Sequence, residues 1–516
     1  MIWAGDLMRV FARVALVATL AVATGCGSTV AGVGSTNNGQ SGAAGLSAPA
    51  GSSPASGSGT TGGGAGGLAP GAGQPGGQAG GTTAAGNGAS SSGMGGGQAG
   101  TSSPVSGRGY DAHHLYLGFP TNNDVNRAAP SGLGATDFGD QPSIIKAVVD
   151  DINRHGGILG RTIVPLFHDI ATANLETDPT SQAQATCTAF TQDAHVVAVV
   201  NIVAGIDLPT FYSCLAHHDT PLISAGFVPA DDALFNSYAP YLYKLTAASF
   251  TQLTPLWLTR LTAMGYFHGW NTTTGGPAAG QAKVGLLYPS QQPQQRIFSD
   301  VKRRLTAAGY TVAKEYQYDA SSLNNESASM SNAVLQMRNA GVTHILSSES
   351  DVLLFMTAAD SQHYRPRYAL TSYHAAAVQL QGTVPNSQLV GSMGVGWLPV
   401  SDVDASHDPG PVSGGETSCR KLMQAAGQST STASAEIVEL AICDAVRLTA
   451  DAINLSKNPT SGGLHAGLAA LGAGFASALT WRNGLAPNRY DEPGAVREFA
   501  FNGSAYSYVS STLYPL

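Results

Sequence analysis

The stretch NRHGGILGRTIVPLFHDIA, residues 153–171, decides the fold of this chain. It continues an amphipathic helical pattern, stops at a glycine-rich turn, and then becomes an apolar run that ends on His168 and Asp169. Gly156 and Gly157 are expected to take left-handed conformations at the helix C-terminus, and Asp169 is expected to cap the turn that follows. A nucleotide loop places its glycines between a strand and the start of a helix. The stretch therefore predicts a helix-to-strand connection without a phosphate site.

Outward from this stretch, short apolar segments alternate with amphipathic ones. The alternation starts at residue 114 and restarts at KVGLLYPS, residues 283–290, after a long helix over 250–264. Strands separated by helices of about 10–15 residues indicate parallel sheets with right-handed crossovers. Strands are expected at 114–119, 161–168, 196–203, 221–226, 283–290, 310–316, 342–348, 367–372 and 388–399, with a closing hairpin at 496–509. Helices are expected at 141–157, 178–193, 208–219, 250–264, 294–309, 326–341, 351–362 and 434–455.

The two sets of alternating segments predict an α/β protein with two doubly wound parallel-sheet lobes. Roughly 400 residues follow Arg108, more than a single core usually serves. Doubly wound sheets bind ligands outside the carboxyl ends of their strands. A cleft is therefore expected where the strand ends of the two lobes face each other.

The region before Arg108 has a different composition. Residues 27–107 contain no Asp, Glu, Lys or Arg and consist mainly of Gly, Ser, Ala and Thr. Such a segment cannot bury enough apolar surface to offset its ordering entropy. Residues 26–109 are therefore predicted to be a disordered tether with a mean reach of roughly 50 Å.

The N-terminus resembles a bacterial lipoprotein signal. MRVFARVALVATLAVATGCG, residues 8–27, has two arginines, an apolar run and then Cys26. The resemblance implies that residues 1–25 are a signal peptide and that Cys26 is acylated, which would hold the protein on the outer face of the cytoplasmic membrane. Ala23 stands where Leu is preferred, so an uncleaved anchor helix and an ordinary secretory peptide are the alternatives. Translation starts at Met1 or at Met8.

Four cysteines remain after Cys26. An even number in an oxidising compartment favours two disulfides, and the spacing favours Cys187 with Cys214 and Cys419 with Cys443. The alternative is four buried free thiols. There is no C-x-x-C pair, so the sequence gives no support to a zinc ribbon or to thioredoxin chemistry.

Several functional classes lack their signals. A net charge of −8 without a basic run argues against nucleic acid as a partner. The chain has no G-x-S-x-G, Walker or H-E-x-x-H motif, so no enzyme activity and no cofactor are expected. S-x-x-K occurs at 299–302 and 418–421 without its usual partner motifs. The histidine pairs at 113–114 and 217–218 lack further ligands, so no metal site is expected.

The segment IIKAVVDDINRHGGILGRTIVPLFHD, residues 144–169, is similar to the start of type I periplasmic binding proteins, in particular the leucine/isoleucine/valine-binding branch. The resemblance implies a Venus flytrap with three crossovers, near Tyr243, Pro399 and Leu455. It implies capture of a small polar solute, an amino acid or a related compound, for the permease and ATPase of an ABC importer. A receptor that reports solute binding to a membrane partner is the alternative. The implied lobes are 110–242 with 400–455, and 243–399 with 456–516.

The same resemblance implies a set of ligand-binding residues. Amino-acid binders of the family hold the ligand carboxylate after the third and fourth strands and its amino group with an acid of the second lobe. The usual serine pair is replaced here by Ala204 and Gly205, and no threonine follows Gly226. Glu349 is expected to pair an ammonium, or alternatively to open a helix near Asp351. By position the implied set is Ala204, Gly205, Ser224, Ala225, Gly226, Tyr288, Glu349, Thr371 and Tyr373, with Tyr288 and Tyr373 suited to stacking.

Overall fold

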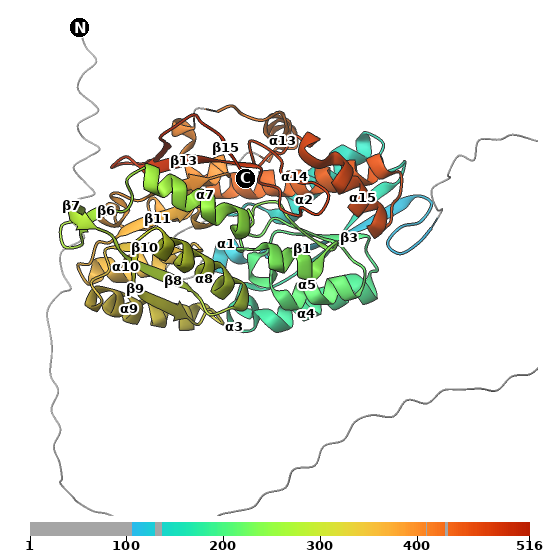
Figure 1. Ribbon diagram of the computed structural model, residues 1–516. Helices are drawn as coiled ribbons and strands as arrows, with labels where there is room; N and C mark the ends of the chain where they lie inside the picture. The colour runs from blue at the N-terminus through green and yellow to red at the C-terminus, as the bar shows by residue number, and fades with distance from the viewer. Residues whose placement is uncertain (1–105, 129–136, 409, 429–431) are drawn as a thin grey trace, which may run out of the picture. The chain divides into compact units, whose positions relative to one another are not determined.

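The computed structural model describes residues 106–128, 137–408, 410–428 and 432–516 (Figure 1). The predicted signal peptide, Cys26 and most of the predicted tether lie outside the described residues. The described chain is built on two sheets covered by helices, with a small separate hairpin. The expected α/β class with parallel sheets is confirmed.

The first sheet contains five parallel strands in the order β2-β1-β3-β4-β5. This is a doubly wound order, with a switch point between β1 and β3. Helices α2 and α14 cover one face, and α4 and α5 pack together on the other (Figure 1). The strands are β1 (His114–Thr121), β2 (Thr162–Asp169), β3 (Ala198–Asn201), β4 (Leu222–Ser224) and β5 (Leu242–Lys244). The helices are α1 (Val125–Ala128), α2 (Gln141–Arg154), α3 (Thr172–Thr177), α4 (Pro179–Thr188), α5 (Pro209–His217), α6 (Asp232–Tyr238) and α14 (Ala433–Ser456).

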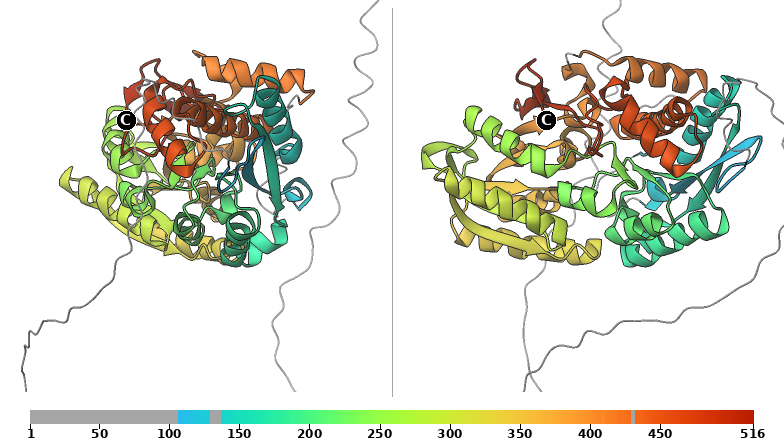
Figure 2. Two further views of the ribbon diagram at one scale, coloured as in Figure 1. Left: turned by 90° about the vertical axis from the view of Figure 1, so that its right-hand side faces the viewer. Right: turned by 45° about the vertical axis from the view of Figure 1, so that its right-hand side comes forward.

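The second sheet repeats this order. Its parallel part runs β9-β8-β10-β11-β12, and an antiparallel edge of β13 and β14 follows, with β15 also paired to β13. Helices lie on both faces of the sheets (Figure 2). The strands are β8 (Lys283–Pro289), β9 (Thr311–Tyr318), β10 (His344–Ser347), β11 (Arg367–Thr371), β12 (Met393–Gly396), β13 (Ala495–Phe501), β14 (Tyr506–Tyr508) and β15 (Tyr514–Pro515). The helices are α7 (Phe250–Ala263), α8 (Gln292–Ala307), α9 (Leu323–Asn339), α10 (Val352–Ser361), α11 (Asn386–Leu389), α12 (Pro399–Asp402) and α13 (Gly414–Ala425).

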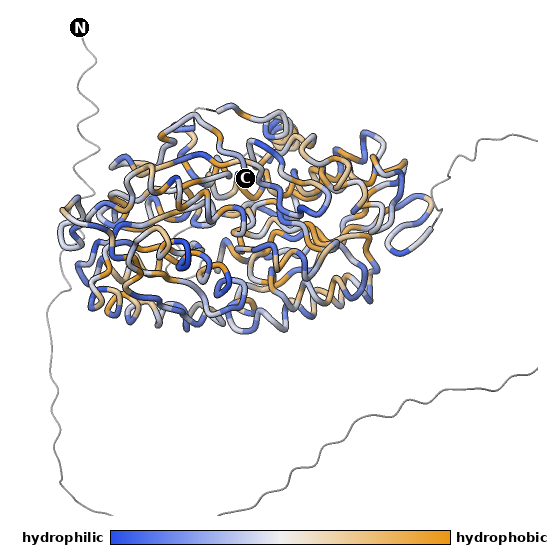
Figure 3. The backbone as a smooth tube through the Cα atoms, viewed as in Figure 1, coloured by the Kyte–Doolittle hydropathy of each residue, from blue (hydrophilic) through white to orange (hydrophobic). Residues whose placement is uncertain are grey.

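The apolar core follows the strands. Apolar residues run through the interior and hydrophilic ones collect at the outer turns (Figure 3). One buried apolar cluster continues from the first sheet into the strand ends of the second through Phe250, Tyr373 and Trp397. The rings of Phe250 and Tyr373 are stacked with centroids 5.2 Å apart. The start of α7 is therefore packed onto the strand ends of the second sheet by aromatic side chains.

The glycine turn behaves as predicted. Gly156 has φ 104° and Gly157 has φ 68°, both left-handed, at the end of α2. A Cβ on Gly157 would lie 2.0 Å from the carbonyl oxygen of Arg161, so only glycine fits there. Ile158 is buried, and the N–H of the next residue donates to Asn454 Oδ1 of α14 at 2.8 Å. The turn thus ties α2 and β2 to a helix that is distant in sequence.

The side chain of Asp169 has a different role from the one predicted for it. Its Oδ1 accepts from the hydroxyl of Thr121 at 3.0 Å and from the N–H of Asn123 at 3.1 Å. Asp169 therefore stabilises the turn after the neighbouring strand β1. It does not cap the turn after β2, the strand that it ends.

Several elements, β5 and α6 among them, were not expected from the sequence, and two more are longer. One is the hairpin of β6 (His268–Asn271) and β7 (Gly276–Gln281). The other is α15 (Ser461–Leu471), which packs along α14. A Cβ on Gly467 would lie 1.9 Å from the carbonyl oxygen of Ala452, so the two helices meet backbone to backbone. The lobe boundaries stay predictions. Because α15 packs along α14, the third crossing of the chain between the lobes is favoured near β13 instead of near Leu455.

The segment that leads to β13 also closes the edge of the first sheet. The N–H of Lys244 in β5 donates to the carbonyl of Tyr490 at 2.9 Å, and the N–H of Glu492 donates to the carbonyl of Lys244 at 2.9 Å. Asp491 forms a parallel bridge with Lys244. The outer strand of the first sheet is therefore covered by residues from the last tenth of the chain.

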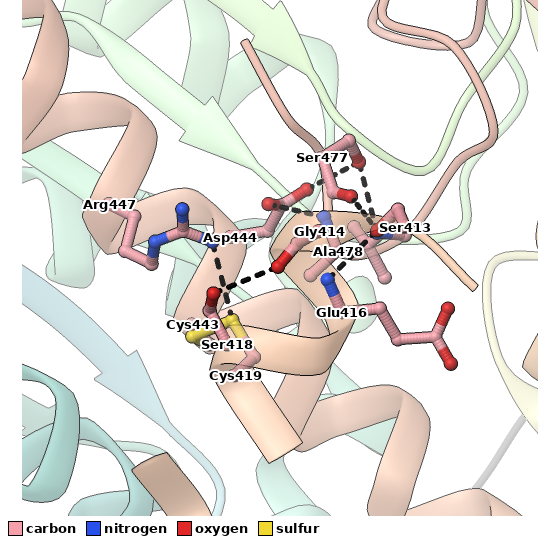
Figure 4. Close-up of a disulfide and its surroundings, with 11 residues drawn as sticks. Ser413, Gly414, Glu416, Ser418, Cys419, Cys443, Asp444, Arg447, Ser477 and Ala478 are labelled. Atoms are coloured by element: carbon pink, nitrogen blue, oxygen red, sulfur yellow. Dashed lines mark hydrogen bonds between the residues drawn. A yellow bond between two sulfur atoms is a disulfide. The ribbon is translucent and has the colours of Figure 1, made fainter. Parts of the chain in front are cut away.

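Both expected disulfides are present. Cys187 pairs with Cys214 and joins α4 to α5, while Cys419 pairs with Cys443 and joins α13 to α14 (Figure 4). Each closes a loop of about 25 residues and contributes roughly 3 kcal/mol on the chain-entropy estimate. Next to the second disulfide, the Asp444 carboxylate accepts from Ser477 Oγ and the N–H of Ala478, both at 2.7 Å. This position on α14 therefore anchors the segment that follows α15.

Candidate functional site

The carboxyl ends of the two sheets face each other. Tyr373, which follows β11, donates its hydroxyl to the carbonyl of Ala248 at 2.7 Å. The indole N–H of Trp397, after β12, donates to the carbonyl of Thr246 at 2.8 Å. Both acceptors follow β5 of the first sheet. The strand ends of both sheets therefore line one region, where ligands of doubly wound folds bind.

A bidentate ion pair bridges the two lobes at this region. Arg296 near the start of α8 donates from Nε and Nη2 to the two carboxylate oxygens of Asp231, at 2.7 and 2.8 Å. Asp231 also caps α6 by accepting from the N–H of Leu234 at 2.8 Å. Side-chain hydrogen bonding to Asp231 raises the pKa of the Arg296 guanidinium. The pair fixes one lobe against the other through a helix of each.

The edge of the first sheet carries a buried ion pair. Lys244 Nζ lies 2.5 Å from Asp207 Oδ2, and neither side chain is exposed. Ser224 donates its hydroxyl to the same oxygen at 3.0 Å, and Tyr212 donates its hydroxyl to the backbone carbonyl of Asp207 at 2.6 Å. Lys244 Nζ also lies 5.3 Å from the centre of the Tyr212 ring. The charge at this edge is thus neutralised within the chain.

The facing edge of the second sheet carries acids. Glu349, after β10, accepts from the amide Nε2 of Gln294 at 2.9 Å, and Asp351 accepts from the hydroxyl of Tyr318 at 2.8 Å. Burial, followed by repulsion from Asp351, raises the pKa of Glu349 to about 8, although Lys244 of the first sheet acts to lower it. Burial and Asp351 also raise the pKa of Glu326 to about 11. Among the described residues, none of these acids forms an ion pair.

Several buried polar atoms at the two edges have no hydrogen-bond partner among the described residues. Unpaired buried polar groups are costly, and each calls for an explanation such as a ligand or a water molecule. Three of these atoms lie at the edge of the second sheet and one lies at the edge of the first sheet. They are Gln294 Oε1, Ser348 Oγ, Glu326 Oε1 and Asp207 Oδ1.

Comparison with known proteins places this geometry in a family. Residues 129–480, more than half of the chain, match the family model described as periplasmic binding protein. The chain belongs to the periplasmic binding protein family. It is a solute-binding protein and not an enzyme, as predicted. No curated protein matches the chain.

Solved structures similar to this periplasmic binding protein are distant in sequence. A possible leucine/isoleucine/valine-binding protein from Rhodopirellula baltica SH 1 is 14% identical, with a TM-score of 0.52 over 79% of this chain and 98% of that one. A fatty acid ABC transporter substrate-binding protein from Thermomonospora curvata is 14% identical, with a TM-score of 0.56 over 80% and 94%. A solute-binding protein from R. palustris in complex with 4-hydroxybenzoate is 14% identical, with a TM-score of 0.53 over 76% and 95%. At this identity the likeness establishes the shared fold alone.

The predicted first-lobe residues are engaged within the periplasmic binding protein itself. Ser224 binds Asp207, the N–H of Ala225 donates to the carbonyl of Asn201, and the N–H of Gly226 donates to Ser224 Oγ at 3.2 Å. Ala204 and Gly205 begin an exposed 3-10 turn instead of lining the buried edge. Contact of these residues with a solute remains a prediction.

The predicted second-lobe residues divide into two groups. Glu349 lies at the facing edge, and Tyr373 lies between the lobes, stacked on Phe250. Tyr288 stacks on Phe298 at 4.4 Å and directs its hydroxyl to Glu315 on β9 at 3.0 Å. Thr371 is buried and caps the 3-10 turn over Ser372–His374. Glu349 is therefore the predicted residue best placed to meet a solute.

Sequence reasoning missed the polar and charged partners at both edges, which were not in the predicted site: Asp207, Lys244, Gln294, Glu326 and Asp351. One signal was present, because Lys244 interrupts the apolar run YLYKL at the end of a strand. A lysine at such a position is rarely buried unless it is paired.

Other features of the described chain lie away from these edges. A hollow of about 280 Å³ is bounded by α2, α13 and α14, and another of about 220 Å³ lies between α7 and α8. In the part of the chain that the structure describes, no helix is long and apolar enough to cross a membrane. No cluster of three or more His, Cys, Asp and Glu side chains within that part has the arrangement of a metal site.

Proposed function

We propose that this protein is an extracytoplasmic, lipid-anchored binding protein that captures a small polar solute between its lobes and delivers it to the permease and ATPase of an ABC importer. The observation that carries the proposal is the convergence of Asp207, Lys244, Gln294 and Glu349 at facing strand ends. Unpartnered buried acceptors at both edges suit a bound solute. Structurally similar proteins named as ABC transporter substrate-binding proteins support the transport role.

The lipid anchor is supported by residues outside the described chain. Cys26 ends a signal-like apolar segment and precedes an uncharged region up to residue 107. The two disulfides suit an oxidising compartment outside the cytoplasm. A tether of this length lets the lobes reach a permease in the same membrane.

Solute entry requires the lobes to separate, because the residues at the facing edges are largely buried. Hinge closure around a ligand is the usual motion of two-lobed binding proteins. The Arg296–Asp231 ion pair joins the lobes and must break on opening. The structure therefore corresponds to a closed arrangement.

The test is a thermal-shift screen of the chain that lacks residues 1–25 and carries Cys26→Ser. The library contains amino acids, amines, amides, aromatic acids and fatty acids. A solute present at 100 times its dissociation constant is expected to stabilise the fold by roughly 2.7 kcal/mol. If no class of solute shifts the melting temperature, the proposal of solute capture is wrong. Radiolabelled palmitate incorporated at Cys26, and lost in Cys26→Ser, tests the anchor.

A further inference from the structure

The first-lobe edge already contains a carboxylate in the place that the family resemblance implies for the ligand carboxylate. The Asp207 carboxylate accepts from Ser224 and Lys244. It lies directly over the backbone of the fourth strand end, because a Cβ on Gly226 would be 2.7 Å from Asp207 Oδ2. A solute carboxylate entering here would find its place taken by the Asp207 carboxylate and the donors Ser224 and Lys244 already engaged.

The second-lobe edge has the opposite character, with acceptors that lack donors. The Gln294 amide is 4% exposed, and its Nε2 is fixed on Glu349, so its Oε1 lies beside the acid without a partner. Ser348, which precedes Glu349 and is 1% exposed, has an unpartnered Oγ. A solute bearing N–H groups would supply the donors that these buried atoms lack.

The charge balance at this edge points the same way. Glu349, Glu326 and Asp351 approach closely enough to repel one another, and their described polar neighbours, Gln294 and Tyr318, are uncharged. Lys244 is a cation that acts on the pKa of Glu349, but its ammonium is bound to Asp207. A cationic solute could pair with the Glu349 carboxylate in exchange for the proton that burial favours there.

Resting on the proposed capture of a solute between the lobes, we propose that this solute is a cation without a carboxylate, an organic amine or guanidinium compound. Its N–H groups bind Glu349, Gln294 Oε1 and Ser348 Oγ, while its body lies between the lobes. The internal carboxylate of Asp207 then excludes α-amino acids, because it occupies the place of the ligand carboxylate.

Matched probes that differ only in their charged groups test this specificity. The alkyl set is 3-methylbutylamine, L-leucine and 4-methylpentanoate, and the aromatic set is 2-phenylethylamine, L-phenylalanine and 3-phenylpropanoate. A third set is agmatine, L-arginine and 4-guanidinobutanoate. Calorimetric titration of the chain without residues 1–25 is expected to give at least tenfold tighter binding of the decarboxylated amine in one or more sets. Tighter binding of the amino acid or of the acid would overturn the inference and leave solute capture standing. Absence of binding by every probe and by the wider library would overturn both.

Two variants locate the specificity in named residues. Glu349→Gln keeps the shape and removes the charge, so the amine is expected to lose at least tenfold in affinity. Glu436→Gln is the matched control, because Glu436 pairs with Arg420 at 2.5 Å in the outer helices; it is expected to leave affinity unchanged. Asp207→Asn removes the internal negative charge and is expected to raise the affinity for the amino acid of the same set. Unchanged selectivity in a folded Asp207→Asn protein would contradict the role of Asp207.

Discussion

The two strand-end edges that face each other carry their acids in opposite states. At the first, Asp207 is held by a lysine and a serine of the same sheet, with all of its charge compensated inside the chain. At the second, Glu349, Glu326 and Asp351 lie together without an ion pair among the described residues. A buried charge is tolerated only when it is paired or neutralised by a proton. At the first edge the charge of Asp207 is paired with Lys244. At the second edge the acids are neutralised by protons in the absence of a solute.

The difference teaches how one fold assigns structure and binding to equivalent positions. Both edges end a sheet with the same strand order, and both collect polar side chains there. The Asp207–Lys244 pair rigidifies the first lobe. In the second lobe Glu349 has no ion-pair partner, so binding of a cation there can lower the free energy. Asymmetry between the two lobes, and not the fold itself, therefore sets what is bound.

The largest expected effect comes from breaking the buried pair. Lys244→Met leaves the Asp207 carboxylate buried without its cation, so the free energy of unfolding should fall by about 3–5 kcal/mol. Urea denaturation followed by circular dichroism measures it. Lys302→Met, which removes an exposed lysine paired with Glu315, should cost at most about 1 kcal/mol. Equal losses in the two variants would show that the buried pair has no special role.

The next effect is the pH dependence of amine binding. Burial raises the pKa of Glu349 to about 8, so below that pH the free protein holds a proton there that a bound ammonium must displace. Affinity should therefore rise by up to about tenfold per pH unit between pH 6 and 7, and level off above 8. Other titratable groups also face the Glu349 carboxyl: Asp351, Glu326, Tyr318 and Lys244. The variant Glu349→Gln leaves all four unchanged and so isolates the contribution of Glu349. In Glu349→Gln the slope should disappear; a slope that persists would assign the proton to another group.

The smallest effect concerns the bridge between the lobes. Arg296→Gln removes the bidentate pair with Asp231, which is partly exposed, so the closed arrangement should lose about 1 kcal/mol. Small-angle scattering should report a larger radius of gyration in the absence of solute, and solute should reverse it. A variant as compact as the parent protein would show that this ion pair does not hold the lobes together.

Much of the fold could be predicted from the sequence because local signals agreed. The glycine turn at 156–157, the apolar periodicity and the cysteine spacing each determined neighbouring structure. Helix α15 was missed because its segment SGGLHAGLAALGAG has the composition of a loop. Its glycines serve close packing on α14, a long-range contact that no local propensity contains.

The candidate site was less predictable for the same reason. Glu349 could be found, since it directly follows a buried strand. The Asp207–Lys244 pair joins residues 37 apart through the parallel register of β4 and β5, in which Ser224 lies beside Lys244. That register emerges only once the sheet is assembled.

The cover that Tyr490 and Glu492 place over β5 has a consequence for how the protein is made. Most of the first sheet is synthesised early, but its outer strand β5, which pairs with β4 on one side, has no partner on its other side until residues near 490 have emerged. Before those residues are available, a sheet formed by the N-terminal half would keep this edge unpaired, a surface prone to association with other chains. Completion of the first lobe waits for almost the whole polypeptide, so truncated chains are expected to aggregate and only full-length molecules to complete the fold.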